Sequence, residues 1–301
     1  MTLPTFLVIG AAKSGTTALY ELLGQHPQIF MSPVKETNFF AFDGTPPKVG
    51  GPGADFSASV LEPSAYRRLF DSAVDESARG EVSPMYMALA EVASQRIARL
   101  LPEVKLIAIL RQPAERAYSS FLHLRRDGRE PIADFAAALA AEEGRIAAGW
   151  GYLWRYRQLG HYAEQLRPYY ARFPASQIEV CLYERLRDAS ADLLAELDRF
   201  LGVDPGLRRP AAARPNVSGE PRSERLAAAL RSPSRARRAV AALLPRSARR
   251  WLAGSLGRLN LSRPQLQTEL RRRLTADFHD QIGELEELTG LDCAAWLEGP
   301  G

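Results

Sequence analysis

Residues whose types and spacing suit phosphate binding lie near the start of the chain. The segment reads Gly10-Ala-Ala-Lys13-Ser14-Gly15-Thr16-Thr17, between a short apolar run and a stretch with helical spacing. A tight loop between a strand and a helix binds phosphate because backbone N–H groups and the helix N-terminus point at the anion. In the loop Gly-x-x-x-x-Gly-Lys-Ser/Thr of nucleotide-binding proteins, a lysine would stand at position 16. This chain has Thr16 there and a lysine three residues earlier, at Lys13. The cation that contacts a bound phosphate is therefore expected at a different place in the loop.

A second group of cationic and hydroxyl side chains follows another apolar run, Lys105–Leu110. Arg111 comes directly after that run, and Ser119 lies two turns into the helical stretch beyond the next proline. An arginine at a strand end and a hydroxyl on the following helix can bind a phosphate through charge-assisted hydrogen bonds. The two groups together predict a ligand with phosphates at two separate places.

Five apolar segments are predicted to be the strands that position these groups. They do not alternate between polar and apolar residues, as is typical of strands covered on both faces. Helical patterns separate them, which predicts an α/β fold, a three-layer sandwich with a central parallel sheet. The phosphate loop then lies at the carboxyl end of the first strand, where such sheets bind ligands. The predicted strands are Phe6–Gly10, Gln28–Met31, Gly80–Ser83, Lys105–Leu110 and Ile178–Leu182.

The 301 residues are predicted to form a single domain, because there is no internal repeat and no clear linker. We expect a core over about residues 5–221, an Arg-rich helical extension over about 222–263 and a C-terminal helix over about 264–297. Apolar residues recur at helical spacing in the last segment, and Gly290 is expected to end it. The loop Asp43–Ser59 is rich in Gly and Pro, and it fits a lid or substrate wall as well as a disordered excursion.

Composition excludes a membrane-spanning protein and favours a cytoplasmic one. No apolar run approaches the roughly 20 residues needed to cross a bilayer, and the N-terminus lacks the pattern of a signal peptide. Cys181 and Cys293 have no metal-ligand spacing, so we expect buried thiols in a reducing compartment. The content of Ala and Arg is bacterial in style. Residues 222–263 hold eleven arginines and one acidic residue, so the basic character of the chain is local.

Several of these segments resemble the sulfotransferases that use 3′-phosphoadenosine 5′-phosphosulfate (PAPS). The first loop resembles their 5′-phosphosulfate loop, and Arg111-Gln-Pro-Ala-Glu-Arg-Ala-Tyr-Ser119 resembles their 3′-phosphate motif. Val180–Leu186 and Phe200–Val203 are similar to later parts of the family, so the likeness extends from residue 5 to about 205, with a weaker match that ends at Trp296. The resemblance implies a P-loop NTPase-like fold, PAPS as sulfuryl donor, 3′,5′-adenosine bisphosphate (PAP) as product, and no metal.

The resemblance also assigns roles in the donor site. A sulfuryl group carries less charge than a transferred phosphoryl group, so a lysine aimed at the bridging oxygen suffices without a metal ion. Lys13 is the candidate for that catalytic role. The expected donor-binding residues are Lys13, Ser14, Gly15, Thr16, Thr17, Arg111, Ser119, Tyr183, Arg214 and Arg222.

Transfer to an alcohol needs a base, and Glu36 is the candidate. It lies in a segment, Pro33–Phe40, that resembles the one in which heparan-type members carry a glutamate base, and a surface ion pair is the alternative role. A glutamate walled by aromatic residues would have its pKa raised, which makes it a better base. In heparan-modifying members a lysine follows the equivalent of Glu81, whereas this chain has Val82, so the resemblance does not identify a heparan-like acceptor. Further candidates for acceptor contact are Lys35, Phe39, Glu81, Tyr86 and Trp154.

Two other classes of function stay open from the residues. A metabolite kinase on the same fold would need a lysine at position 16 and an acidic magnesium ligand at a strand end. A non-enzymatic RNA- or membrane-binding protein would use the basic amphipathic stretch Ser234–Leu261, which could instead cover the acceptor cleft or be a solvated helix. The favoured hypothesis has a small-molecule or glycan acceptor, with a hydroxyl rather than an amine as nucleophile, no nucleic acid, and peripheral membrane contact as an option for that stretch. The histidines show no spacing for a metal or triad, so surface or capping roles are expected for them.

Overall fold

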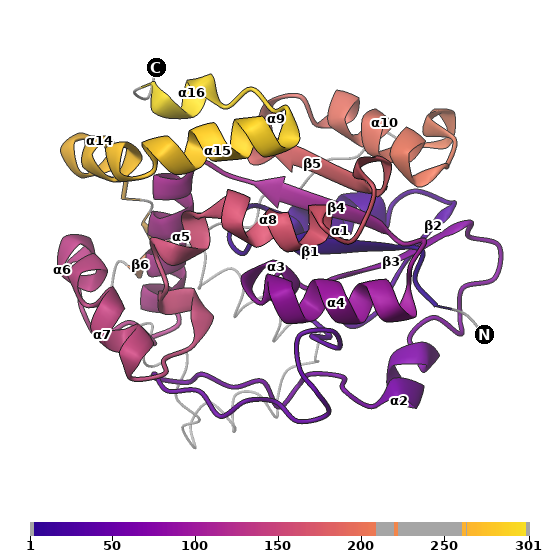
Figure 1. The fold of residues 1–301 in the computed structure, drawn as a ribbon, viewed down its shortest axis with the longest axis horizontal. Helices are drawn as coiled ribbons and strands as arrows, with labels where there is room; N and C mark the ends of the chain where they lie inside the picture. The colour runs from indigo at the N-terminus through magenta and orange to yellow at the C-terminus, as the bar shows by residue number, and fades with distance from the viewer. Residues whose placement is uncertain (1–2, 209–219, 222–260, 263, 299–301) are drawn as a thin grey trace, which may run out of the picture.

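The computed structural model describes residues 3–208, 220–221, 261–262 and 264–298. Its centre is a parallel sheet in the order β2-β3-β1-β4-β5, as Figure 1 shows. The strands are β1 (Phe6–Gly10), β2 (Ile29–Met31), β3 (Ala78–Val82), β4 (Lys105–Leu110) and β5 (Ile178–Leu182). All five predicted strands are therefore present, and only the bounds of β2 and β3 differ by one or two residues from the prediction.

Helices cover both faces of the sheet, which makes the predicted three-layer sandwich (Figure 1). Leu7 and Ile9 of β1 pack in one core with α4 (Ala90–Leu100), α8 (Tyr162–Tyr170) and α15 (His279–Thr289). Phe6 and Val8 point to the other face, toward α1 (Thr16–Leu23) and α10 (Ser190–Leu201). Because Phe6 to Ile9 are completely buried, the continuous apolar run reflects a strand with no solvent-exposed face.

Shorter elements complete the described chain. The remaining helices before residue 208 are α2 (Pro63–Arg68), α3 (Met85–Ala88), α5 (Pro113–Arg126), α6 (Phe135–Ala140), α7 (Glu142–Ala147) and α9 (Tyr183–Asp188). Four single turns of 3-10 helix lie at Tyr152–Trp154, Gln158–Gly160, Ala175–Gln177 and Pro205–Leu207. Two short strands, β6 (Glu220–Pro221) and β7 (Leu261–Ser262), pair antiparallel.

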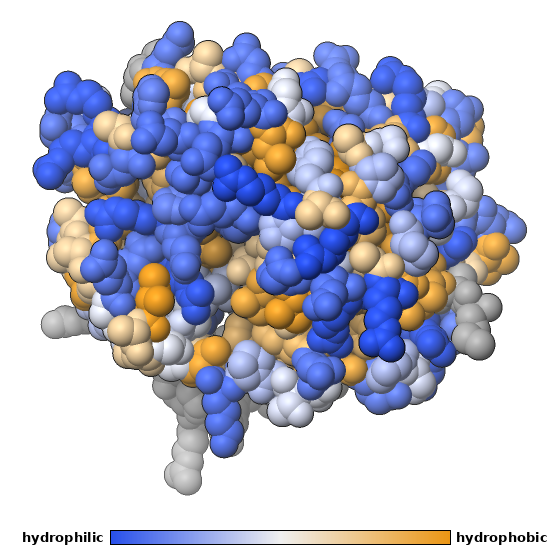
Figure 2. All heavy atoms as spheres, in the orientation of Figure 1, coloured by the Kyte–Doolittle hydropathy of each residue, from blue (hydrophilic) through white to orange (hydrophobic). Residues whose placement is uncertain are grey.

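The C-terminal segment is three helices rather than the single predicted one. They are α14 (Thr268–Asp277), α15 and α16 (Ala294–Leu297). Phe278 interrupts the helical pattern because its backbone leaves the helical conformation while its side chain stays in the core. Gly290 ends α15 with φ at 72°, as its position in the sequence predicted. Hydrophilic residues cover most of the outer surface of α14 and α15 in Figure 2, so their apolar sides face the core.

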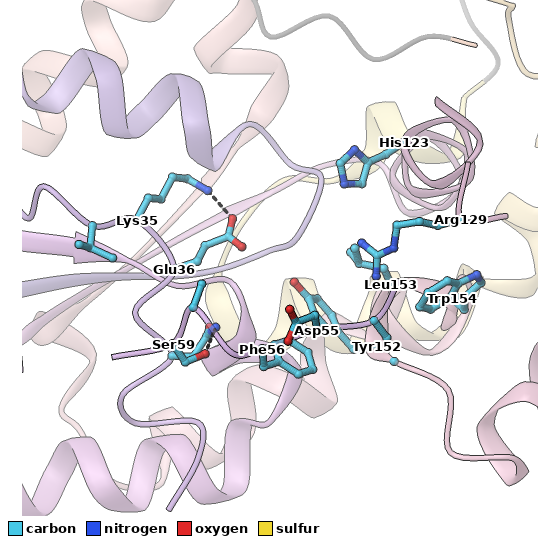
Figure 3. A pocket seen from close by; sticks show the side chains of 15 residues that line it. Lys35, Glu36, Asp55, Phe56, Ser59, His123, Arg129, Tyr152, Leu153 and Trp154 are labelled. Atoms are coloured by element: carbon cyan, nitrogen blue, oxygen red, sulfur yellow. Dashed lines mark hydrogen bonds and ion pairs between the residues drawn. The ribbon is translucent and has the colours of Figure 1, made fainter. Parts of the chain in front are cut away.

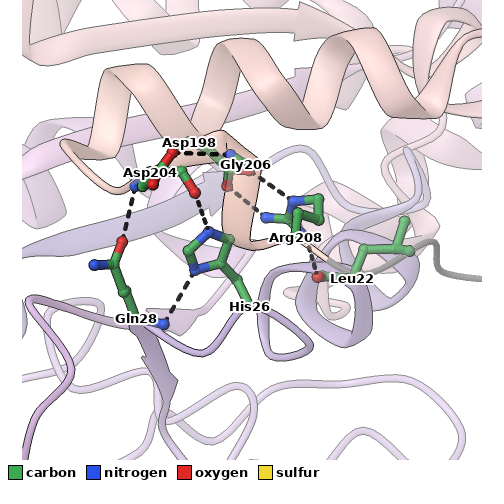
Figure 4. Close-up of polar contacts among 7 residues, drawn as sticks. All are labelled: Leu22, His26, Gln28, Asp198, Asp204, Gly206 and Arg208. Carbon is green, nitrogen blue, oxygen red and sulfur yellow. Dashed lines mark hydrogen bonds and ion pairs between the residues drawn. The ribbon is translucent and has the colours of Figure 1, made fainter.

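A polar network ties the end of α10 to the start of β2 (Figure 4). Arg208 binds both carboxylate oxygens of buried Asp198 and donates to the backbone oxygen of Leu22 at 2.7 Å. His26 donates to the backbone oxygen of Asp204 at 3.0 Å and accepts from the N–H of Gln28 at 3.1 Å. His26 is buried, so it does not have the surface role that was one of the two expected, and its ring instead binds backbone groups at both nitrogens.

Candidate active site

The phosphate loop connects β1 to α1 through residues in unusual backbone conformations. Lys13 has φ at 71°, and Gly15 has φ at 93° as the residue that precedes α1. A Cβ at Gly15 would lie 2.7 Å from Cδ2 of Tyr183. Only glycine permits both this backbone conformation and the close approach of the tyrosine ring.

The loop forms one wall of a cavity of about 450 Å³. Residues from the ends of β1, β4 and β5 meet in it, as expected for ligand binding at the carboxyl edge of a parallel sheet. Of the predicted donor-binding residues, the cavity is lined by Lys13, Gly15, Thr16, Thr17, Arg111, Ser119 and Tyr183. Ser14 is completely buried instead, and its Oγ has no hydrogen-bond partner among the described residues.

Arg111 is held in place at the end of β4. Its guanidinium carbon lies 5.1 Å from the centre of the Tyr183 ring, and its Nη2 lies 3.3 Å from the carboxylate of Glu115. These contacts fix the direction of a cation that the sequence could only locate along the chain.

Lys13 lies in an environment that makes its charged form less favourable than in water. Burial and the nearby guanidinium of Arg126 lower the pKa of Lys13 to about 8, although Asp127 and Glu36 act in the opposite direction. A phosphate in the cavity would restore the balance in favour of the ammonium group. We therefore expect the pKa of Lys13 to be higher when an anion occupies the cavity than when the cavity is empty.

A second cavity, of about 400 Å³, is drawn in Figure 3 and shares lining residues with the first. Its walls come from the segment that follows β2, from the Asp43–Ser59 loop, and from the turn Gly151–Trp154. The loop is an ordered wall: Gly50 N donates to Gly149 O at 2.8 Å and Gly50 O accepts from Gly151 N at 3.1 Å. The sequence fitted a lid or substrate wall as well as a disordered excursion, and in the structure the loop forms a wall of the second cavity.

The two cavities share five residues: Lys35, Glu36, His123, Tyr152 and Leu153. Lys35 Nζ lies 2.5 Å from Glu36 Oε1, and the Glu36 side chain is 47% exposed, so it can reach a ligand in either cavity. Glu36 adopts a left-handed backbone conformation with φ at 63°, which its N–H stabilises by donating to Val82 O at 2.8 Å. The acid and the phosphate loop are thus brought to one junction from different strands.

Three of the residues predicted to contact an acceptor lie in the core instead. Phe39, Glu81 and Tyr86 line neither cavity and are buried. The Glu81 carboxylate accepts hydrogen bonds from the hydroxyls of Thr37, Tyr66, Ser83 and Tyr86. Burial raises the pKa of Glu81, and the four donors oppose that shift. Four hydroxyl groups therefore satisfy the Glu81 carboxylate, which lines neither cavity.

Lys35 and Trp154 do line the second cavity, although Trp154 is only 1% exposed. Arg214 and Arg222 lie outside the described residues, as does all but the end of Ser234–Leu261.

His123 was missed by sequence reasoning, which expected surface or capping roles for the histidines. Its side chain lies in the wall that both cavities share, and Arg126 donates to its Nδ1 at 2.7 Å. Burial and the charge of Lys13 lower the pKa of His123 to about 3, so its imidazole is neutral near pH 7. One local signal was available, since His123 lies one helical turn beyond Ser119 on the same face of α5.

The described residues contain no group of His, Cys, Asp and Glu that could hold a metal ion, and both cysteines there are free and buried. Among the helices of the described segments, none is long and apolar enough to cross a membrane.

A loop of the phosphate-binding type at the carboxyl edge of a parallel sheet, with a second cavity beside it, is the arrangement expected of a group-transfer enzyme. Residues 4–205 match the model of the sulfotransferase family. The chain belongs to the family of PAPS-dependent sulfotransferases.

The chain is similar to several relatives of that family and to one solved structure. It is 33% identical to the bifunctional heparan sulfate N-deacetylase/N-sulfotransferase of Drosophila melanogaster. The alignment spans 210 residues, which are 67% of this chain and 20% of the relative. Human bifunctional heparan sulfate N-deacetylase/N-sulfotransferase 2 is 30% identical over 213 residues, and this alignment covers 68% of this chain and 22% of the relative. The chain thus spans about a fifth of the length of these relatives. The crystal structure of a sulfotransferase from Alicyclobacillus acidocaldarius superimposes with a TM-score of 0.77 at 30% identity, over 99% of this chain and 100% of that one.

Proposed function

We propose that the protein transfers the sulfuryl group of PAPS to a hydroxyl group of a small molecule, glycolipid or glycan, without a metal ion. The observation that carries this proposal is the junction of the two cavities, where Lys13 and Glu36 face a common space. A donor in the first cavity and an acceptor in the second would meet there. An amine nucleophile is a less favoured alternative, supported by the N-sulfotransferase names of the relatives.

In the proposed reaction the acceptor oxygen attacks the sulfur atom in line with the leaving phosphate. Glu36 accepts the hydroxyl proton as the new oxygen–sulfur bond forms. The bond between sulfur and the bridging oxygen breaks, and that oxygen stays with PAP. Lys13 stabilises the negative charge that develops on it, a role that in kinases is shared with Mg²⁺.

The other lining residues are assigned to the two ends of the donor. Thr16 and Thr17 at the start of α1, with the loop N–H groups, would bind the 5′-phosphate. Arg111 and Ser119 would bind the 3′-phosphate, supported by their place in the same cavity and by the contacts that orient Arg111. Tyr183 completes this end, and Arg214 and Arg222 remain predictions.

We also propose that the protein works in a reducing compartment such as the cytoplasm. The two cysteines, which are free thiols, are compatible with this. Peripheral membrane contact through Ser234–Leu261 stays a prediction.

Calorimetric titration with PAP in the absence of magnesium tests the donor site. We expect binding that Arg111→Ala weakens by roughly a hundredfold, since a charge-assisted pair is lost, and that Lys13→Ala also weakens. ATP is the control ligand for the kinase alternative. Absence of PAP binding, or preference for ATP with magnesium, would contradict the proposal.

A further inference from the structure

Arg129 lies at the end of the second cavity opposite Glu36. Figure 3 shows its guanidinium group directed into the cavity, across from the Glu36 carboxylate, with Tyr152 and Phe56 along the side between them. The electrostatic effects agree with this arrangement, because Glu36 raises and Arg129 lowers the pKa of Tyr152, on which burial has the largest effect. The two ionised groups therefore act on one space from different sides.

The position of Arg129 is fixed by contacts that leave part of its guanidinium group unused. Its Nε donates to Pro52 O at 3.1 Å, and its guanidinium carbon lies 5.0 Å from the centre of the Trp154 ring. The aliphatic part of the side chain runs beside Gly53, where an added Cβ would lie 3.5 Å from Cγ. Within the described segments, its two Nη groups have no hydrogen-bond or ion-pair partner. An arginine held in this way is ready to bind an anion without losing side-chain freedom.

The other charged groups of the cavity are already paired or capped. Lys35 pairs with Glu36, and the Asp55 carboxylate accepts from the N–H and Oγ of Ser57, both at 2.8 Å. His123 is neutral near pH 7 because its pKa is lowered to about 3. Among the described residues, Arg129 is thus a cation of this cavity that forms no ion pair, although the Asp55 carboxylate in the same wall keeps its charge.

We propose that Arg129 binds a carboxylate of the acceptor while Glu36 receives the reacting hydroxyl group. The acceptor is then a small hydroxylated molecule with one carboxylate at the end remote from the nucleophile. A cavity of about 400 Å³ suits a molecule with one or two rings, and Phe56 and Tyr152 offer aromatic surfaces for a ring face. This inference rests on the proposed function and deepens it, since it names what the acceptor carries besides its hydroxyl.

A matched pair of acceptors tests the proposal: 4-nitrophenyl β-D-glucuronide and 4-nitrophenyl β-D-glucoside. They differ in a carboxylate against a hydroxymethyl group on the same ring. Transfer from radiolabelled PAPS is measured for the wild-type protein, Arg129→Gln, Arg129→Lys and the control Arg155→Gln, whose arginine lies next to the cavity wall without lining it. We expect the wild type and Arg155→Gln to use the glucuronide with kcat/KM about tenfold or more above the glucoside, as one charge-assisted pair provides.

Arg129→Gln is expected to remove that preference through the KM for the glucuronide, and Arg129→Lys to retain part of it. Equal use of both acceptors by the wild type, preference for the glucoside, or transfer to neither would overturn the proposal. PAP titration of each variant separates the hypotheses. If PAP binds normally and the acceptors are not discriminated, only the role of Arg129 is wrong, whereas loss of PAP binding by the wild type removes the proposed function itself.

Discussion

At the scale of single residues, Lys13 combines a cost to folding with a proposed role in catalysis. Its ammonium group is largely shielded from water and lies near the Arg126 guanidinium, and these effects lower its pKa to about 8 in spite of Asp127 and Glu36. A lysine with a lowered pKa binds fewer protons in the folded than in the unfolded chain between about pH 8 and its ordinary value of 10.5. The free energy of unfolding therefore increases as the pH rises through that window. Below about pH 8 the lysine is charged in both states, and its buried charge destabilises the fold.

We expect Lys13→Met to raise the free energy of unfolding at pH 7 by about 1 kcal/mol, because a methionine has no charge to bury. The same variant should bind PAP at least about tenfold more weakly, since the cation is lost. For the wild type, PAP affinity should fall as the pH rises above about 8, where Lys13 loses its proton. Urea unfolding and calorimetry at pH 7 and 9.5 measure these changes, with exposed Lys48→Met as the control. A destabilised Lys13→Met, or pH-independent PAP binding, would contradict this account.

At the scale of elements, the loop after β2 holds Glu36 in a backbone conformation that non-glycine residues rarely adopt. Glu36 and Asn38 both have left-handed backbone conformations, with φ at 63° and 54°, which cost free energy outside glycine. Thr37 lies between them, completely buried, and donates to the Glu81 carboxylate at 2.9 Å. The buried Glu81 carboxylate therefore anchors the loop through its hydrogen bond with Thr37.

Two matched variants can separate the anchoring of this loop from general stability. Thr37→Val and Tyr66→Phe each remove one hydroxyl that donates to Glu81, but only Thr37 belongs to the loop. We expect both to lower the free energy of unfolding by about 1–2 kcal/mol. Only Thr37→Val should also speed hydrogen exchange at the Glu36 amide and lower kcat, with PAP affinity unchanged. Equal effects of the two variants on kcat and on exchange would show that the loop does not depend on this anchor.

At the scale of the whole molecule, the C-terminal helices are part of the main core. Trp296, Phe278 and Ile282 belong to the same buried cluster as Leu7 and Ile9 of β1. Gln112, the residue before α5, donates to Thr275 Oγ1 at 2.9 Å and to the backbone oxygen of Trp296. The helix that carries Ser119 and His123 is thus braced by residues more than 150 positions later in the chain.

Neighbouring residues of α16 offer a test of this arrangement. Trp296 is 2% exposed and Leu297 is 41% exposed. Trp296→Ala should lower the free energy of unfolding by about 3 kcal/mol, and Leu297→Ala by less than about 0.5 kcal/mol. We expect a single transition in urea for both, followed by circular dichroism, because one core unfolds as a unit. A separate early transition in Trp296→Ala would instead mark the C-terminal helices as an independent unit.

The strands, the phosphate loop and Lys13 could be read from the sequence because they depend on local patterns. A continuous apolar run is a strand when both of its faces are covered, and a loop between strand and helix presents its N–H groups wherever the sheet places it. Even the break at Gly290 follows from one residue and its permitted backbone conformations. The break at Phe278 does not, since the apolar spacing continues through a residue whose backbone leaves the helical conformation.

What only the tertiary structure decided is which side chains share a space. Glu81 and Glu36 are both glutamates near strand ends, yet one is enclosed by four hydroxyls and the other faces the junction of two cavities. Arg129 and His123 meet Glu36 across a cavity whose other wall is a glycine- and proline-rich loop. Contacts of this kind join segments far apart in the chain, and their energies depend on packing and burial that no local pattern records. The sequence alone determined the fold and the phosphate loop, whereas long-range packing determined the second cavity.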